Sequence, residues 1–245
     1  MKELDKVMAV QRMQNHIENN LNRNITLYEL SKCSNHSPWY SAKLFKEYIG
    51  KGPFEYIRLM RLTKSALELR DSDKRVVDVA LDFVFDSHEG FTRAFKKKFG
   101  ITPQKYKKDK PPIYLYTPYP IKEQYMLNTK IDKNNEDKVS ENYFVQIMNF
   151  PKRKFILKRG IRATNYFEYV NEVGCEIWGL LCSIKEALNE PIGVWLPEKF
   201  ITEGTSVYVQ GVEVPMDYCG IVPEGLEINT LPSCKMMVLQ CEPFE

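Results

Sequence analysis

The sequence predicts a multidomain protein: an all-α double helix-turn-helix N-terminal domain over residues 1–108, and an α+β C-terminal domain with an antiparallel sheet over residues 144–245. Three observations predict this division. Residues 26–50 and 75–100 repeat one pattern of apolar and basic positions. Four prolines follow within twelve residues, and strand-like segments occur only in the second half. At 245 residues, the chain is long enough for two ordinary domains.

Charge divides the chain near the same place. Residues 1–110 hold 22 Lys and Arg against 14 Asp and Glu, a net charge of +8. The remaining residues hold 13 against 18, a net charge of −5, so the whole chain carries +3. A basic half suits a polyanionic partner such as nucleic acid. On charge alone, a merely solvated basic surface explains the first half equally well.

The first repeat is preceded by an expected helix over residues 5–21, whose apolar residues recur at helical spacing. Thr26 and Glu29 then form a capping box at the start of a short helix. Ser37 is the expected N-cap of the next helix. The outward face of that helix carries Trp39, Ala42, Lys43 and Lys46. An exposed Trp on a basic face favours contact with DNA; the alternative is that Trp39 folds back onto the core.

The second repeat shows the same organisation. Ser87 is the expected N-cap, and a buried stripe of Phe residues recurs every four positions. The outward face carries Glu89, Thr92, Arg93 and Lys96, with Lys97 on its flank. Arg93 is the best candidate for bidentate recognition of guanine. His88 near the helix start contacts phosphate or a base, or is simply solvated.

A short apolar helix, a tight turn and a capped basic helix are the parts of a helix-turn-helix, whose second helix enters the DNA major groove. A long helix from residue 53 to about 70 joins the two copies and sets their separation, which should be about 34 Å for neighbouring groove segments. The predicted DNA-binding residues are Ser37, Trp39, Ala42, Lys43, Lys46, Ser87, His88, Glu89, Thr92, Arg93, Lys96 and Lys97.

Three stretches of this half resemble the DNA-binding domain of the AraC/XylS family of bacterial transcription regulators. They are SPWYSAKLFKEYIG at 37–50, FEYIRLMRLTKSALEL at 54–69 and DSHEGFTRAFKKKFGITPQKYKK at 86–108. The resemblance implies two helix-turn-helix subdomains on one long helix. Two residues depart from the family pattern. Ala42 replaces a long polar side chain, and Val84 stands where the family places Gly at positive φ, so we expect a distorted or softened second turn.

Residues 109–143 are expected to be a linker, proline-rich and extended at its start and polar at its end. Beyond it, one helix is expected over residues 166–189, between strand-like segments. This half resembles the gyrase-inhibitor-like effector-binding domain, through RGIRATNYFEYVNEVGCEIWGLL, GVWLPE, GTSVYVQGVEVP and LPSCKMMVLQ. The resemblance implies a pocket between two modules for lipophilic, often cationic, compounds. Because the second module ends after its first strand, we expect a truncated chain, a pocket completed by another subunit, or a pocket that does not function.

The candidate ligand-binding residues are aromatic side chains suited to stacking on a flat cation, with one carboxylate as a charge partner. They are Tyr166, Tyr169, Trp178, Trp195, Tyr208 and Glu213. For each aromatic residue, an ordinary place in the core is the more common explanation.

The function expected from these features is sequence-specific DNA binding by a transcription regulator with a small-molecule-sensing domain. The expected partner is double-stranded DNA, and a lipophilic or cationic effector and RNA polymerase are further candidates. Alternatively, the second domain is a protein-interaction platform or a small-molecule hydrolase that would use Glu213. No phosphate loop, nucleophile elbow or HExxH motif occurs, so we expect no enzyme. We expect no cofactor, no metal, no membrane partner, a cytoplasmic location and six reduced core cysteines.

Overall fold

The computed structural model describes residues 2–131 and 143–241. The chain forms two compact units. The first holds the described residues up to 110 together with 115–131, and the second holds 111–114 and 143–241. Within this described part of the chain, no helix is both long and apolar enough to cross a membrane. The expected polar end of the linker, at 132–142, lies outside the described residues.

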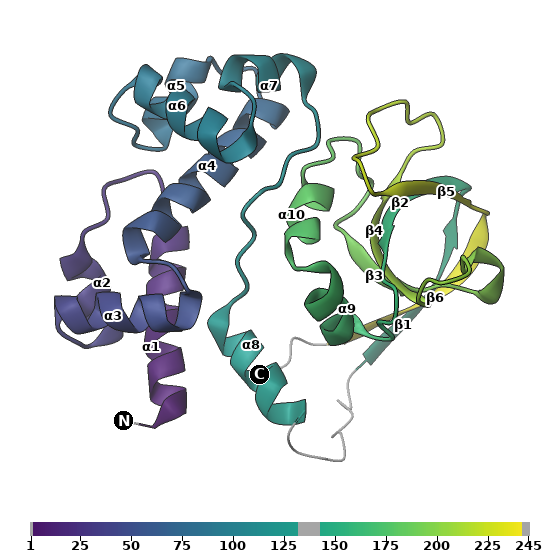
Figure 1. Cartoon of the computed structure of the whole chain (residues 1–245), viewed down its shortest axis with the longest axis horizontal. Helices are drawn as coiled ribbons and strands as arrows, with labels where there is room; N and C mark the ends of the chain where they lie inside the picture. Colours follow the sequence, from purple (N-terminus) through teal and green to yellow (C-terminus); the bar gives the residue numbers. More distant parts are fainter. Residues whose placement is uncertain (1, 132–142, 242–245) are drawn as a thin grey trace. The chain divides into compact units, whose positions relative to one another are not determined.

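The first unit is helical (Figure 1), and three of its helices begin directly after the capping residues that the sequence predicts. The capping residues Thr26, Ser37 and Ser87 each accept a hydrogen bond from a backbone N–H in the first turn of the following helix. The first helix ends three residues earlier than expected. The helices are α1 (Glu3–Glu18), α2 (Leu27–Ser34), α3 (Pro38–Ile49), α4 (Pro53–Asp71), α5 (Val76–Asp82), α6 (His88–Phe99) and α7 (Pro103–Asp109).

A further helix, α8 (Ile121–Ile131), corrects the expectation of a plain linker. Its start is held on α1 by the buried side chain of Gln14. The Gln14 amide oxygen accepts from the backbone N–H of Ile121 at 3.0 Å, and its amide nitrogen donates to the Tyr119 carbonyl at 3.1 Å. The backbone N–H of Tyr116 also donates to the Thr63 hydroxyl of α4. Residues 115–131 therefore belong to the helical unit.

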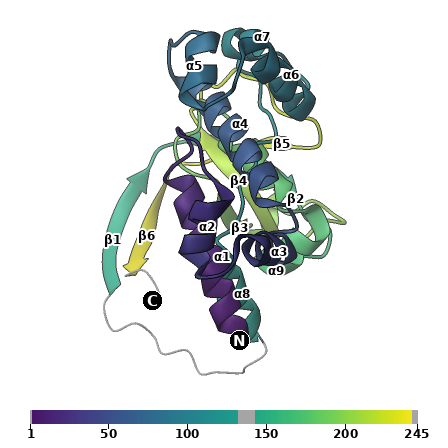
Figure 2. The same cartoon turned by 90° about the vertical axis from the view of Figure 1, so that its left-hand side faces the viewer.

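The second unit contains a four-stranded antiparallel sheet in the order β3-β4-β2-β5. A separate antiparallel pair, β1 and β6, lies outside that sheet, and Figure 2 shows the two strands running side by side. The strands are β1 (Tyr143–Phe150), β2 (Arg153–Arg159), β3 (Ile192–Trp195), β4 (Tyr208–Val214), β5 (Glu227–Leu231) and β6 (Cys234–Cys241).

The single helix expected over residues 166–189 is wrong. Two short helices, α9 (Tyr166–Val173) and α10 (Glu176–Cys182), replace it. Gly174 separates them with φ at 91°, a backbone conformation that L side chains rarely adopt. The apolar spacing continues across this break, which is why periodicity alone predicted one helix. A short 3₁₀ turn, η1 (Glu198–Phe200), follows β3.

The four-stranded sheet has apolar side chains on both faces. Ile156 and Val212 lie on the face packed by α9 and α10. Phe155, Leu157 and Val209 form a smaller cluster on the opposite face. The cysteines do not all lie in the core as expected, because Cys175, Cys219 and Cys234 are exposed and Cys33 and Cys182 are half-buried.

Candidate nucleic-acid interface

Helix α3 buries Ser41, Leu44 and Phe45 and leaves its basic side exposed. Trp39 on that side is 71% exposed, so its ring does not fold back onto the core. The Lys43 ammonium lies 5.6 Å from the centre of the Trp39 ring, one helical turn away. The two side chains together form an exposed aromatic surface beside a cation.

Helix α6 repeats α3 position by position. Both helices have twelve residues, a Ser N-cap and a Gly at the end in left-handed conformation, with φ of 74° at Gly50 and 75° at Gly100. Phe91 and Phe95 of α6 are fully buried. Because the buried positions match, the outward positions of the two helices match as well.

The outward side of α6 is basic and exposed. The structure places His88, Glu89, Arg93, Lys96 and Lys97 at the surface. Among the described residues, no carboxylate lies within ion-pair distance of Arg93, Lys96 or Lys97, whereas Lys74 nearby in sequence is held between Glu68 and Asp82. The cations of α6 are therefore available to a polyanion without first breaking an internal pair.

Thr92 behaves differently from its neighbours on α6. Its residue is half-buried, and its hydroxyl oxygen is fully covered without a hydrogen-bond partner in the described structure. The Ala42 position on α3 is half-buried too. Ala42 and Thr92, which occupy matching positions in the two helices, are therefore less exposed than the cations around them.

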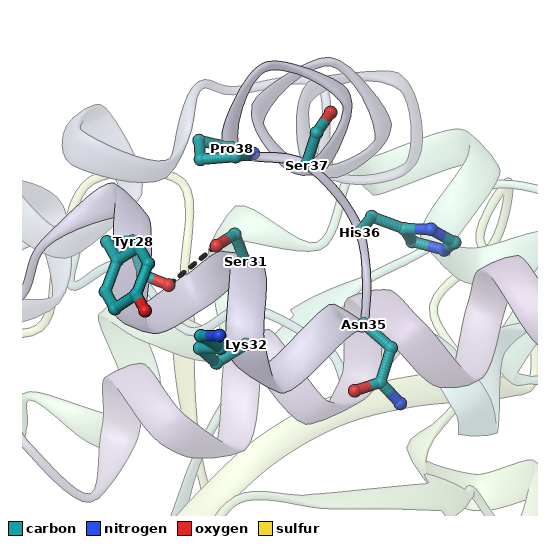
Figure 3. Close-up of a pocket in the computed structure, with 7 residues that line it drawn as sticks. All are labelled: Tyr28, Ser31, Lys32, Asn35, His36, Ser37 and Pro38. Carbon is teal, nitrogen blue, oxygen red and sulfur yellow. Dashed lines mark hydrogen bonds between the residues drawn. The ribbon is translucent and has the colours of Figure 1, made fainter.

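A hollow at the turn between α2 and α3 was not predicted from the sequence. It has a volume of about 640 Å³ and is lined by Tyr28, Ser31, Lys32, Asn35, His36, Ser37 and Pro38. Figure 3 shows Tyr28 and Lys32 on α2, facing the hollow opposite the start of α3. The Lys32 ammonium lies 5.0 Å from the centre of the Tyr28 ring. The signal in the sequence was an exposed aromatic residue four positions before a lysine, the same spacing as Trp39 and Lys43.

The two capped helices are joined by α4, whose 19 residues span about 28 Å at the usual helical rise. Arg61 of α4 donates hydrogen bonds to the carbonyls of Leu21 and Arg23, which lie between α1 and α2. These bonds fix α4 to the first helix pair, so α4 acts as a structural spacer between the two helix pairs. Burial lowers the pKa of Arg61 from its ordinary value.

In the second unit, the structure brings together three of the aromatic residues considered for ligand binding. Tyr208 lies between Tyr169 and Trp195, with ring centres 5.5 Å and 5.1 Å away. Tyr169 and Tyr208 are buried, and the Tyr169 hydroxyl donates to the Lys158 carbonyl. Trp195 is 63% exposed, and its indole N–H donates to the Thr164 carbonyl. Trp195 is therefore the solvent-facing end of an aromatic row.

The other ligand candidates do not form one site with this row. Tyr166 packs against the same helix-covered core that contains Tyr169 and Tyr208, and Trp178 is half-buried on α10. Glu213 and Tyr208 are an odd number of residues apart on β4, so they face opposite sides of the sheet. The Glu213 carboxylate accepts a hydrogen bond from Arg153 at 2.6 Å, with both side chains buried.

Comparison with known proteins places the helical unit in a family. A helix-turn-helix domain family model matches residues 30–109. The transposon Tn10 TetD protein of Escherichia coli is 40% identical over 94 residues, which cover 38% of this chain and 68% of that protein. The transcriptional activator AarP of Providencia stuartii is 34% identical over 91 residues, covering 37% of this chain and 67% of AarP. The chain belongs to the AraC family of helix-turn-helix transcription regulators.

In a longer relative, a matched segment of similar length covers a smaller share of the protein. The transcriptional regulator Rob of Salmonella typhimurium is 38% identical over 92 residues, which span 32% of its length and 38% of this chain. Among solved structures, the C-terminal domain of the response regulator AraT from Geobacillus stearothermophilus is 25% identical, with a TM-score of 0.39. That comparison covers 41% of this chain and 84% of the AraT chain.

Proposed function

We propose that the chain binds an asymmetric double-stranded DNA site through α3 and α6, each placed in the major groove. The observation that carries the proposal is the match between these two helices in length, caps and outward cations. A single such helix reads only a few base pairs. Two helices held by one spacer read two neighbouring segments, which raises both the affinity and the length of sequence recognised.

In this arrangement, the two helices use different chemistry. Arg93 on α6 offers two parallel N–H donors, which suit the acceptors of a guanine edge. Trp39 and Lys43 on α3 favour apolar packing on a sugar or a thymine methyl beside a phosphate contact. Helix α6 therefore supplies most of the hydrogen bonds that read the base sequence.

The experiment is selection of bound duplexes from a random pool by the full chain, followed by competition against unselected DNA. We expect an enriched sequence whose complex survives a large excess of random duplex at physiological salt. Equal binding to selected and unselected duplexes would leave only electrostatic attraction and would refute the proposal.

We further propose that the second unit senses a flat lipophilic cation through the exposed Trp195 end of its aromatic row. Stacking of such a cation on an indole ring is favourable, and Tyr208 behind it fixes the ring. In the absence of DNA, rhodamine 6G should quench the tryptophan fluorescence of the full chain saturably, and Trp195→Phe should abolish that quenching. Unchanged quenching in the variant would refute this site and favour a protein-interaction role for the unit.

A further inference from the structure

The hollow between α2 and the start of α3 has a cation on one wall and adjoins the proposed DNA-binding face on the other (Figure 3). Lys32 lies on the α2 wall. Ser37 and Pro38 lie on the opposite wall and directly precede Trp39, which is exposed on α3. The seven residues that line the hollow include no carboxylate. Its charge and its place therefore suit an anionic group of the bound DNA.

The charge of Lys32 is not neutralised within the described part of the chain. Glu29 is the acidic residue of the same helix. Its carboxylate already accepts a hydrogen bond from the backbone N–H of Thr26 at 2.8 Å and forms an ion pair with Arg23, also at 2.8 Å. Lys32 itself is exposed and forms no ion pair with any residue of 2–131 or 143–241. Its ammonium is therefore available to an outside anion.

The ring of Tyr28 holds the Lys32 side chain in place. The ammonium lies 5.0 Å from the centre of this ring, which is 63% exposed. Lys43 and Trp39 on α3 form a second such pair at the same spacing, 5.6 Å apart. A free lysine side chain loses conformational entropy when it binds, and a ring that already holds the chain reduces that loss. Tyr28 is therefore a positioning residue for the cation.

The second helix pair does not carry the same two side chains. Counted back from the left-handed residue of each turn, the places of Tyr28 and Lys32 in α2 are taken by Val77 and Leu81 in α5. Both of these residues are exposed, and Leu81 is 63% exposed. A hydrocarbon side chain offers an anion neither charge nor hydrogen bond. The two helix pairs therefore differ at one matching place on their surfaces.

The first helix of a helix-turn-helix crosses the DNA backbone, while the second enters the major groove. Helix α2 is the first helix of its pair, so its outward cation meets phosphate rather than a base edge. We propose that the hollow binds one backbone phosphate beside the segment read by α3, through Lys32 held by Tyr28. Helix α5 makes no matching contact. The proposal rests on the proposed DNA binding and adds that the two helix pairs hold the backbone unequally.

Duplexes with single neutral phosphates test this contact. The sequence selected by the full chain is synthesised with one methylphosphonate at each backbone position in turn. For the wild-type chain, neutralising one phosphate beside the α3 segment should weaken binding by about two- to fivefold. Lys32→Ala should weaken binding to the unmodified duplex by a similar factor and reduce the salt slope by about one unit. At that phosphate alone, the variant should lose no further affinity.

Three further variants separate the contact from a structural effect. Lys32→Arg keeps the charge and should restore the salt slope. Tyr28→Phe keeps the ring and should bind like the wild type, whereas Tyr28→Ala should weaken binding about two- to fivefold. Leu81→Ala is the matched control on α5 and should leave the salt slope and every phosphate effect unchanged. Circular dichroism checks that each variant folds, and both substituted side chains of α2 are exposed.

Wild-type affinity and salt slope in the Lys32→Ala protein would overturn the phosphate contact. So would a variant that still loses affinity at every phosphate that matters to the wild type. In both cases the selected sequence remains, so the proposed function stands. A chain that selects no preferred duplex would instead refute the proposed function, and the phosphate contact with it.

Discussion

Asn35 and Val84 occupy the same left-handed position in the two helix-turn-helix turns, with φ of 60° and 58°. In each turn, this residue donates its N–H to a carbonyl three residues back, and the next residue donates to one five residues back. The capping Ser follows two positions after Asn35 in the first turn and three positions after Val84 in the second. The positive φ expected at Val84 is confirmed, and the turn keeps its hydrogen bonds.

Val84→Gly should stabilise the helical unit by about 1 kcal/mol. A β-branched residue is strained in left-handed conformation by roughly 1–3 kcal/mol, and the greater freedom of Gly in the unfolded chain offsets part of that gain. Urea denaturation of the full chain, followed by helical circular dichroism, measures the change. Asn35→Gly is the control and should change stability little, because Asn tolerates this conformation. An unchanged or lower stability of the Val84→Gly protein would contradict the expectation.

Lys96→Ala and Lys97→Ala should weaken binding to selected and random duplexes alike. Both cations are exposed and have no ion-pair partner among the described residues, so their expected contacts are to phosphate. Each phosphate contact releases about 0.9 counterion, so each substitution should reduce the slope of log K against log salt by about one unit. Lys74→Ala is the control, and it should change DNA binding little. The Lys74 ammonium is already held by Glu68 and Asp82 in the wild-type protein. A loss confined to the selected duplex would indicate base contact instead.

Glu213→Ala should destabilise the second unit by about 3–5 kcal/mol, because it leaves the buried Arg153 guanidinium without its counter-charge. Glu213→Gln should cost less, since the amide oxygen still accepts a hydrogen bond. Chemical denaturation monitored by tryptophan fluorescence measures both changes. Glu176→Ala, at an exposed position of α10, should stay within about 0.5 kcal/mol of the wild type. Equal stability of the Ala and wild-type proteins at position 213 would show that the pair is dispensable.

Acidification should open the loop at residues 161–163. The Glu172 carboxylate accepts hydrogen bonds from the backbone N–H groups of Arg162, Ile161 and Ala163, and these bonds hold its pKa below the ordinary value of 4.5. A carboxyl with a lowered pKa stabilises the folded state above its unfolded pKa. That stabilisation is lost as pH falls through the folded pKa.

Amide hydrogen-exchange protection at 161–163 should therefore be constant at neutral pH and fall below about pH 4.5. Glu172→Gln should lower this protection already at neutral pH and remove its acid dependence. Glu176→Gln is the matched control. Full protection in the Glu172→Gln protein at neutral pH would show that the carboxylate does not hold the loop.

The sequence predicted the features that neighbouring residues determine. The caps at Thr26, Ser37 and Ser87 follow from local hydrogen bonding, and each is present. The features that were missed depend on partners far along the chain. Gln14 binds backbone groups more than 100 residues away, and that contact incorporates residues 115–131 into the helical unit.

The second unit shows the same difference between local features and distant contacts. Its strand segments were readable from their composition, but the pairing of β1 with β6 joins the two ends of the unit, which no local pattern specifies. The partner of Glu213 is likewise sixty residues away. Of the candidate residues, the exposed cations of α3 and α6 were the easiest to predict, because helical spacing alone assigns them to the outward face.

The most direct test of two-helix recognition is to repeat the duplex selection with Arg93→Ala and Trp39→Ala proteins and compare the sequences obtained. In the wild-type selection, we expect two groups of preferred bases about 10 base pairs apart. Arg93→Ala should erase preference in one group only, at a cost of about 1–3 kcal/mol for one base position, and Trp39→Ala should affect only the other group. A single group of preferred bases, or loss of the same bases in both variants, would contradict recognition by two helices.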